Sequence, residues 1–107
     1  MTHRELYSCF PSAVRVQLRE LGLCDPRPPS VTGGMAFAGG PLNNFVFQAL
    51  VRMANLLREA PGSTALVTAV SGILTKQGVS LWSSEPGRAG FAHEDVSEAT
   101  ARETPAR

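Results

Sequence analysis

The residues best suited to chemistry lie in a glycine-rich loop at 31–42, which contains a Gly-Gly pair at 33–34 and a Gly-Gly-Pro motif at 39–41. Asn43 and Asn44 follow at the predicted start of a long helix, where an asparagine side chain can cap a free backbone N–H. A helix N-terminus carries partial positive charge and favours an anion or a developing oxyanion. The pattern indicates an anion-binding wall, and its alternative is a turn that only leads into the helix.

Cysteine and histidine residues are too few and too widely spaced to indicate a metal site. The two cysteines, Cys9 and Cys24, are expected to be free thiols in a reducing compartment. His3 and His93 are isolated in the sequence, and a solvated histidine near each end of the chain is the expected role. We therefore expect no bound metal.

Four secondary-structure elements are predicted to position the glycine-rich loop. Apolar residues recur at helical spacing in 11–21 and 43–59, which predicts two helices. The stretches 64–70 and 78–83 are rich in β-favouring residues and predict strands. Their connection, 71–77, is too long for a tight hairpin turn, so we expect a loop that reaches the site. The predicted core face of the second helix consists of Val46, Leu50, Met53 and Leu57.

Composition places the chain among small globular proteins. It has 107 residues, 43% of them hydrophobic, and a formal net charge of +1, which gives no electrostatic case for nucleic acid or an anionic membrane. No apolar run reaches the length of a transmembrane helix, and the start lacks the apolar core of a signal peptide, so a cytoplasmic location is expected. We predict one domain at 1–84 and a disordered tail at 85–107, with at most a frayed helical turn near 94–102.

Three stretches resemble active-site loops of the thiolases, the acetyl-CoA acetyltransferase family. Residues 5–10 are interpreted as the end of a strand that turns into a loop, and their Tyr-Ser-Cys-Phe segment at 7–10 resembles the second loop of the family. The glycine motifs at 33–34 and 39–41 resemble the third loop, and 71–78 stands where the fourth belongs. The similarity spans residues 4–84 and points to the C-terminal half of the divergent, sterol-carrier-protein-thiolase branch. It implies an α/β fold: a partial thiolase-type domain with helices layered on a small mixed sheet.

The resemblance also implies a function and a set of site residues. The implied activity is that of an acyl-CoA acyltransferase in lipid or sterol metabolism, with a coenzyme A thioester as substrate and no further cofactor. The positions that match catalytic loops are Tyr7, Cys9, Gly40 and Asn44. The positions expected to contact substrate are Met35, Phe37, Gly39, Asn43, Lys76 and Gln77. The alternatives are core packing for Met35 and Phe37, capping for the asparagines and a solvated charge for Lys76.

Departures from the family pattern limit the expected chemistry. Gly40 stands where thiolases carry a catalytic histidine, and Ser8 stands where their second loop carries a glutamate or aspartate. No cysteine lies in 71–78, where the family's fourth loop carries one. Cys9 has a structural place in its loop, because the family's nucleophilic cysteine belongs to a loop in the N-terminal half. We therefore expect either an acyltransferase fragment that is inactive alone or a non-catalytic acyl-CoA-binding subunit. The third alternative is an unrelated small α/β domain.

The implied partners follow from the same resemblance. They are acyl-CoA together with a thiolase N-terminal half, a second copy of the chain, or a small OB-fold acyl-CoA-binding protein. An apolar helix face and an apolar strand with too few partners predict marginal stability in isolation.

Overall fold

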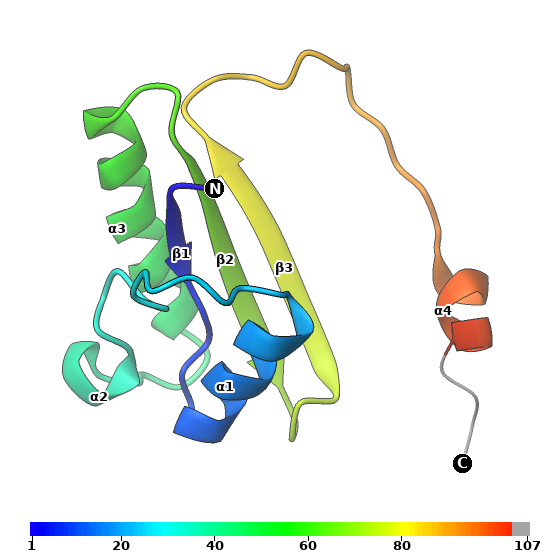
Figure 1. Ribbon diagram of the computed structural model, residues 1–107, viewed down its shortest axis with the longest axis horizontal. Coiled ribbons are helices and arrows are strands. Elements are labelled where there is room, and N and C mark those ends of the chain that lie inside the picture. The colour runs from blue at the N-terminus through cyan, green and yellow to red at the C-terminus, as the bar shows by residue number, and fades with distance from the viewer. Residues whose placement is uncertain (104–107) are drawn as a thin grey trace.

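A computed structural model describes residues 1–103, which form a three-stranded mixed sheet with helices on both faces (Figure 1). The strand order is β1-β2-β3, with β1 parallel and β3 antiparallel to the central β2. The α/β class and the small mixed sheet are thus confirmed. The elements in chain order are β1 (His3–Glu5), α1 (Pro11–Glu20), α2 (Met35–Ala38), α3 (Phe45–Glu59), β2 (Thr64–Ser71), β3 (Lys76–Ser83) and α4 (Ser97–Glu103).

The main core lies between α3 and one face of β2. Met53 and Leu57 are buried there against Ala65 and Val67, as the helical spacing predicted. The other two residues of the predicted face, Val46 and Leu50, are only partly buried, because the helix turns Phe45 and Ala49 toward the core instead. Ala49 is fully buried in this core, a position that the apolar spacing of the larger side chains did not identify.

The opposite face of β2 is covered by α1 through a polar contact. Thr68 donates its hydroxyl to Gln17 Oε1 at 2.5 Å and accepts the Tyr7 backbone N–H at 2.8 Å. The Gln17 side chain amide also donates to the Tyr7 carbonyl at 2.9 Å. Both polar side chains are buried and satisfied, so this network fixes α1 and the exit from β1 on the central strand. The apolar spacing in α1 did not predict it.

The β2–β3 connection differs from the expected loop. The two strands pair along their full length, from Thr64 with Ser83 to Ser71 with Lys76, so only residues 72–75 form the turn. Gly72 has a φ of 64° and Leu74 a φ of 57°, and these left-handed conformations allow the chain to reverse within four residues. Lys76 and Gln77 are consequently strand residues rather than residues of a reaching loop.

The C-terminal segment extends away from the sheet and includes α4 (Figure 1). The helix lies within the stretch expected to hold at most a frayed turn, and Asp95 Oδ1 accepts the Ser97 backbone N–H at its start, at 2.9 Å. Residues 104–107 of the predicted tail lie outside the described residues. Among residues 1–103, no helix combines the length and the apolar character needed to cross a membrane.

Candidate functional site

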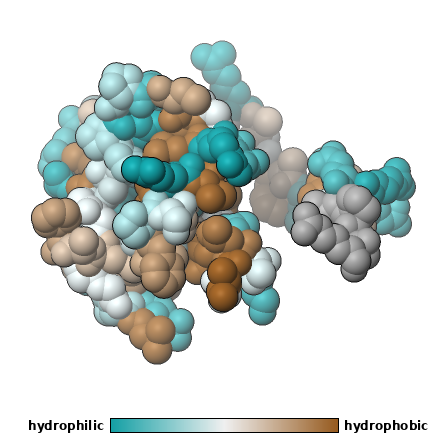
Figure 2. Space-filling model, turned by 60° about the horizontal axis from the view of Figure 1, so that its bottom comes forward, coloured by the Kyte–Doolittle hydropathy of each residue, from teal (hydrophilic) through white to brown (hydrophobic). Residues whose placement is uncertain are grey.

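The segments that resemble thiolase loops converge at one end of the sheet. β1 and β2 are parallel, so both carboxyl ends lie at the lower end of the molecule in Figure 1. The segment after β1, the short helix α2, the N-terminus of α3 and the hairpin turn at 72–75 all lie at that end. Ligand sites of α/β proteins commonly lie outside the carboxyl ends of the strands. Seen from this end, apolar groups alternate with hydrophilic ones on the surface (Figure 2).

Two of the loop motifs meet directly at Ser8. Its hydroxyl accepts the backbone N–H of Met35 at 2.9 Å, which joins the segment after β1 to the start of α2. Gly34 is buried at this junction with a φ of 80°, and a Cβ placed on it would lie 3.0 Å from Ser8 Oγ. Glycine at position 34 is therefore required both by its backbone conformation and by this close approach. Sequence reasoning noted Ser8 only as a replacement and missed this contact.

A buried carboxylate holds the segment that leads into this junction. Glu5, at the end of β1, is fully buried, and its Oε2 accepts the backbone N–H groups of Val31 and Thr32 at 2.8 and 3.0 Å. Its Oε1 accepts the hydroxyls of Ser30 and Thr32 at 2.9 and 2.8 Å. Charge-assisted hydrogen bonds of this kind fix the loop to the sheet. The sequence around Glu5 did not predict that its side chain is a buried hydrogen-bond acceptor.

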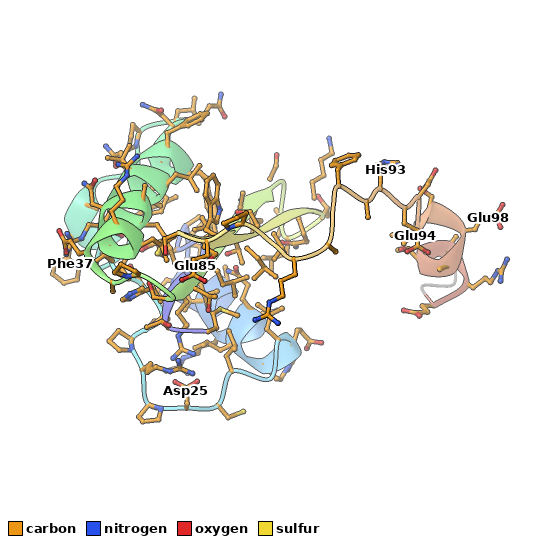
Figure 3. The ribbon with its side chains drawn as sticks, turned by 90° about the horizontal axis from the view of Figure 1, so that it is seen from above. Asp25, Phe37, Glu85, His93, Glu94 and Glu98 are labelled. Atoms are coloured by element: carbon orange, nitrogen blue, oxygen red, sulfur yellow. The ribbon has the colours of Figure 1, made fainter. Side chains whose placement is uncertain are left out.

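A second anchor, Asp25, lies on the loop after α1 (Figure 3). The buried Arg4 side chain pairs with both carboxylate oxygens of Asp25 at 3.1 Å and donates to the Pro28 carbonyl at 3.0 Å. Hydrogen bonds from the Arg27 side chain and backbone, with a further one from Arg4, hold the pKa of the Asp25 carboxyl well below its usual range. A carboxyl that stays ionised in this way is an anchor for the loop and not a suitable general acid.

A mostly apolar groove of about 380 Å³ opens beside the Ser8–Gly34 junction. The Arg15 side chain lies in its lining and has no hydrogen bond or ion pair among residues 1–103. The arrangement offers an apolar surface beside one guanidinium that has no partner within residues 1–103, which suits an elongated apolar ligand with an anionic group. The lining consists of Leu6, Ser8, Pro11, Val14, Arg15, Leu18, Pro29, Ser30, Gly33, Gly34, Met35 and Ala36.

Some of the residues predicted for the site lie in or next to this groove. Met35 is half-buried in the lining, and a Cβ on Gly40 would lie 3.4 Å from its sulfur. Tyr7 is half-buried, with its ring edge-to-face on Phe45 at a centroid distance of 6.1 Å. Cys9, on the same segment as Tyr7, is an exposed free thiol. The structure thus places the motifs that resemble the second and third thiolase loops next to one another.

The remaining predicted residues do not share this groove. Phe37 is 86% exposed and lies at the outer edge of the molecule (Figure 3). Gly39 has a φ of 82° with open space around it. Lys76 and Gln77 belong to β3, and the Gln77 side chain amide donates to the Leu74 carbonyl of the turn at 2.9 Å. Lys76 and Gln77 thus belong to the end of the β2–β3 hairpin and do not line the groove.

The predicted asparagine cap is not formed. Asn44 occupies the N-cap position of α3, but its side chain makes no capping hydrogen bond. Asn43 takes a left-handed conformation with a φ of 59°, which asparagine tolerates better than most residues. Both side chains are exposed, so the turn into the helix depends on the conformation of Asn43 and not on a cap.

No group of histidine, cysteine and acidic residues within 1–103 is arranged to hold a metal ion. His93 and Glu94 lie on the C-terminal segment that extends away from the sheet (Figure 3), and neither lines the groove.

Comparison with known proteins defines the fold class and then the branch. No family model and no curated protein matches the chain. A solved structure does match: a monomeric SCP2-thiolase-like protein, type 1, from Mycobacterium smegmatis, with 36% sequence identity and a TM-score of 0.83. The match covers 95% of this chain and 23% of that protein. The fold is thus SCP2-thiolase-like, and the predicted resemblance to this branch of the thiolases is confirmed, over a segment that spans less than a quarter of the relative's length.

Proposed function

We propose that the chain supplies an acyl-thioester-binding part of a thiolase-like acyltransferase of cytoplasmic lipid metabolism. The observation that carries the proposal is the hydrogen bond between Ser8 and the Met35 backbone, which joins two thiolase-like loops beside a groove. The groove of about 380 Å³ falls within the size range of small-molecule sites, roughly 300–1,000 Å³. Its apolar lining suits the acyl or pantetheine chain, and Arg15 suits a phosphate of coenzyme A.

Turnover of a thioester needs more than this groove. Claisen-type chemistry requires a nucleophile, a proton carrier and an oxyanion hole. Gly40 has no titratable group, and Cys9 is an exposed free thiol that makes no hydrogen bond within residues 1–103. The proposal therefore assigns binding to this chain, and assigns nucleophile and proton carrier to a thiolase N-terminal half or another protein partner. The alternative, a non-catalytic acyl-CoA-binding subunit beside a small OB-fold protein, is supported by the same glycine at position 40.

Calorimetric titration with acyl-CoA of increasing chain length tests the binding proposal. Ala36 and Ala38 are both exposed on α2, but only Ala36 lines the groove. Ala36→Trp is expected to fill the groove mouth and weaken binding about tenfold or more, a loss of about 1.4 kcal/mol. Ala38→Trp is the matched control and is expected to leave the affinity unchanged. Equal effects of the two substitutions, or no binding by the wild type, would overturn the proposal.

Two arginines on α1 allow a controlled test of the proposal that Arg15 binds a phosphate of coenzyme A. Arg15 lines the groove without a partner, whereas Arg19 is paired with Glu20 at 2.7 Å. Arg15→Ala is expected to weaken acyl-CoA binding by about fivefold, because an exposed charge contact contributes about 1 kcal/mol or less. Arg19→Ala is expected to have no effect. If the loss after Arg15→Ala persists at high salt, the guanidinium does not act through charge.

An activity assay tests the absence of turnover in the isolated chain. We expect no cleavage of acetoacetyl-CoA by the purified protein. Cleavage that is abolished by Cys9→Ala would contradict this expectation and would make Cys9 the nucleophile. Cleavage that survives Cys9→Ala would place the chemistry on residues outside the proposed site.

A further inference from the structure

A second cavity, of about 320 Å³, lies beside the amino end of β1, and the segment at 27–31 and α3 complete its walls. It is distinct from the groove past the carboxyl end of β1, because the two linings share only Ser30. Three of the lining residues are arginines and one is a histidine, whereas none of them is acidic. The lining consists of Thr2, His3, Arg4, Arg27, Pro28, Ser30, Val31, Arg52 and Leu56.

Two of the three arginines are held in place by one carboxylate. The Arg4 side chain is 5% exposed and pairs with both oxygens of Asp25 at 3.1 Å. Arg27 donates from Nε and Nη2 to the same carboxylate at 2.8 and 2.9 Å, and from Nη1 to the Met1 carbonyl. Each Nη atom carries two N–H groups, so Arg27 keeps donors for a ligand. One negative charge therefore balances two positive charges in this wall.

Arg52, on α3, provides the third guanidinium. Its side chain is exposed and makes no hydrogen bond or ion pair within residues 1–103, so its N–H groups and its charge are free for a ligand. Glu5, the buried carboxylate of β1, does not line the cavity, and its oxygens accept hydrogen bonds from the segment at 30–32 instead. The cavity therefore has an excess of positive charge.

His3 adds an unsatisfied polar atom to the same wall. Its Nε2 atom is buried and has no hydrogen-bond partner within residues 1–103. Buried polar atoms in folded proteins nearly always have a partner, and an exception calls for an explanation. A ligand rich in oxygen atoms that binds between β1 and α3 supplies acceptors at this wall.

We propose that this cavity binds a small phosphomonoester through its phosphate group. Guanidinium groups match the oxygen atoms of a phosphate in geometry as well as in charge. Pro28, Val31 and Leu56 give the cavity an apolar side that suits the organic part of such a ligand. The volume lies at the lower end of the range of small-molecule sites, roughly 300–1,000 Å³, which fits a small ligand. This site is independent of the proposed binding of acyl-CoA in the groove.

Calorimetric titration of the full chain with phenyl phosphate, in a buffer free of phosphate and sulfate, tests the proposal. Inorganic phosphate and phenol are the comparison ligands, and both are expected to bind more weakly than phenyl phosphate. Arg52→Gln is expected to weaken binding of phenyl phosphate about tenfold. Arg58→Gln is the matched control, because Arg58 is also exposed on α3 but does not line the cavity, and it is expected to leave the affinity unchanged.

Amide chemical shifts locate the bound ligand without any substitution. Phenyl phosphate is expected to shift the amides of 2–4 and of Val31, and to leave the groove amides at 33–36 unchanged. Equal losses from Arg52→Gln and Arg58→Gln would overturn the proposal, because they indicate attraction to the general charge of α3. Binding of phenol or inorganic phosphate as tightly as phenyl phosphate, shifts confined to 33–36, or no binding at millimolar ligand would also overturn it.

The two binding proposals can fail separately. Arg52 does not line the groove, and Ala36 does not line the cavity. Ala36→Trp is therefore expected to leave the affinity for phenyl phosphate unchanged, and a loss after this substitution would place the phosphate in the groove and overturn the separate site.

Discussion

Replacing Glu5 separates the effect of a buried carboxylate from that of its charge. Oε2 accepts two backbone N–H groups, from Val31 and Thr32, whereas Oε1 accepts two hydroxyls. Glu5→Ala leaves the Val31 N–H without an acceptor, whereas the Thr32 N–H keeps a longer hydrogen bond to Ser30 Oγ at 3.2 Å. An unsatisfied buried N–H group costs about 1–3 kcal/mol, so a loss of about 1–3 kcal/mol or more in the free energy of unfolding is expected. The hydroxyls add little, because they can rotate to other acceptors.

Glu5→Gln is expected to be much milder. The glutamine carbonyl can keep the two backbone N–H groups, while its NH₂ group faces hydroxyls that can turn to accept a hydrogen bond. We expect a loss of about 1 kcal/mol, which corresponds to about 4–8 °C in melting temperature for a domain of this size. Urea unfolding followed by circular dichroism measures both variants. If Gln costs as much as Ala, the carboxylate acts through its charge and the hydrogen-bond account is wrong. A loss below about 0.5 kcal/mol for Ala would show that the segment at 30–32 is held by other contacts.

Three further predictions concern stability. The folded-state pKa of Asp25 is lowered, so the ionised carboxyl stabilises the fold above about pH 4, and this stabilisation is lost as the pH falls toward the folded-state pKa. Asp25→Asn should weaken the dependence of the unfolding free energy on acid pH, measured by urea unfolding, and an unchanged dependence would refute the assignment. Gly34→Ala should lower the melting temperature more than Gly39→Ala, since both have positive φ but only Gly34 faces the Ser8 side chain; equal shifts would leave backbone strain as the sole cause. Met53→Ala should cost about 2–5 kcal/mol in unfolding free energy, and a cost below 1 kcal/mol would mean that the core is not closed there.

Much of the fold could be predicted from the spacing of apolar residues and from the glycine and proline residues that end helices and strands. The helix predicted at 43–59 is observed at Phe45–Glu59, and the strand predicted at 64–70 at Thr64–Ser71, because both segments have strong patterns and clear ends. α2 was not predicted, since its four residues are set by the conformations of the flanking glycines. The hairpin was missed for a similar reason: Leu74 in a left-handed conformation gives no signal in a sequence.

The candidate site was predictable only through motifs. The glycine pairs and the segment at 7–10, which the sequence singled out as motifs, lie together at one end of the sheet. The contacts that organise that end come from Glu5, Gln17 and Arg4, which are polar residues buried with their partners. A polar residue in a helix or strand pattern reads as solvent-exposed, and only the fold brings its partner into reach. This is why sequence reasoning found the loops and missed the side chains that hold them.

The most direct test of the central claim is an amide chemical-shift titration of the labelled chain with a medium-chain acyl-CoA. The account predicts saturable shifts at Ser8, at the amides of 33–36 and along the groove-lining part of α1, with the turn at 72–75 unchanged. Shifts confined to the hairpin turn, or none at millimolar ligand, would contradict the claim that the junction of Ser8 and Gly34 frames an acyl-thioester site.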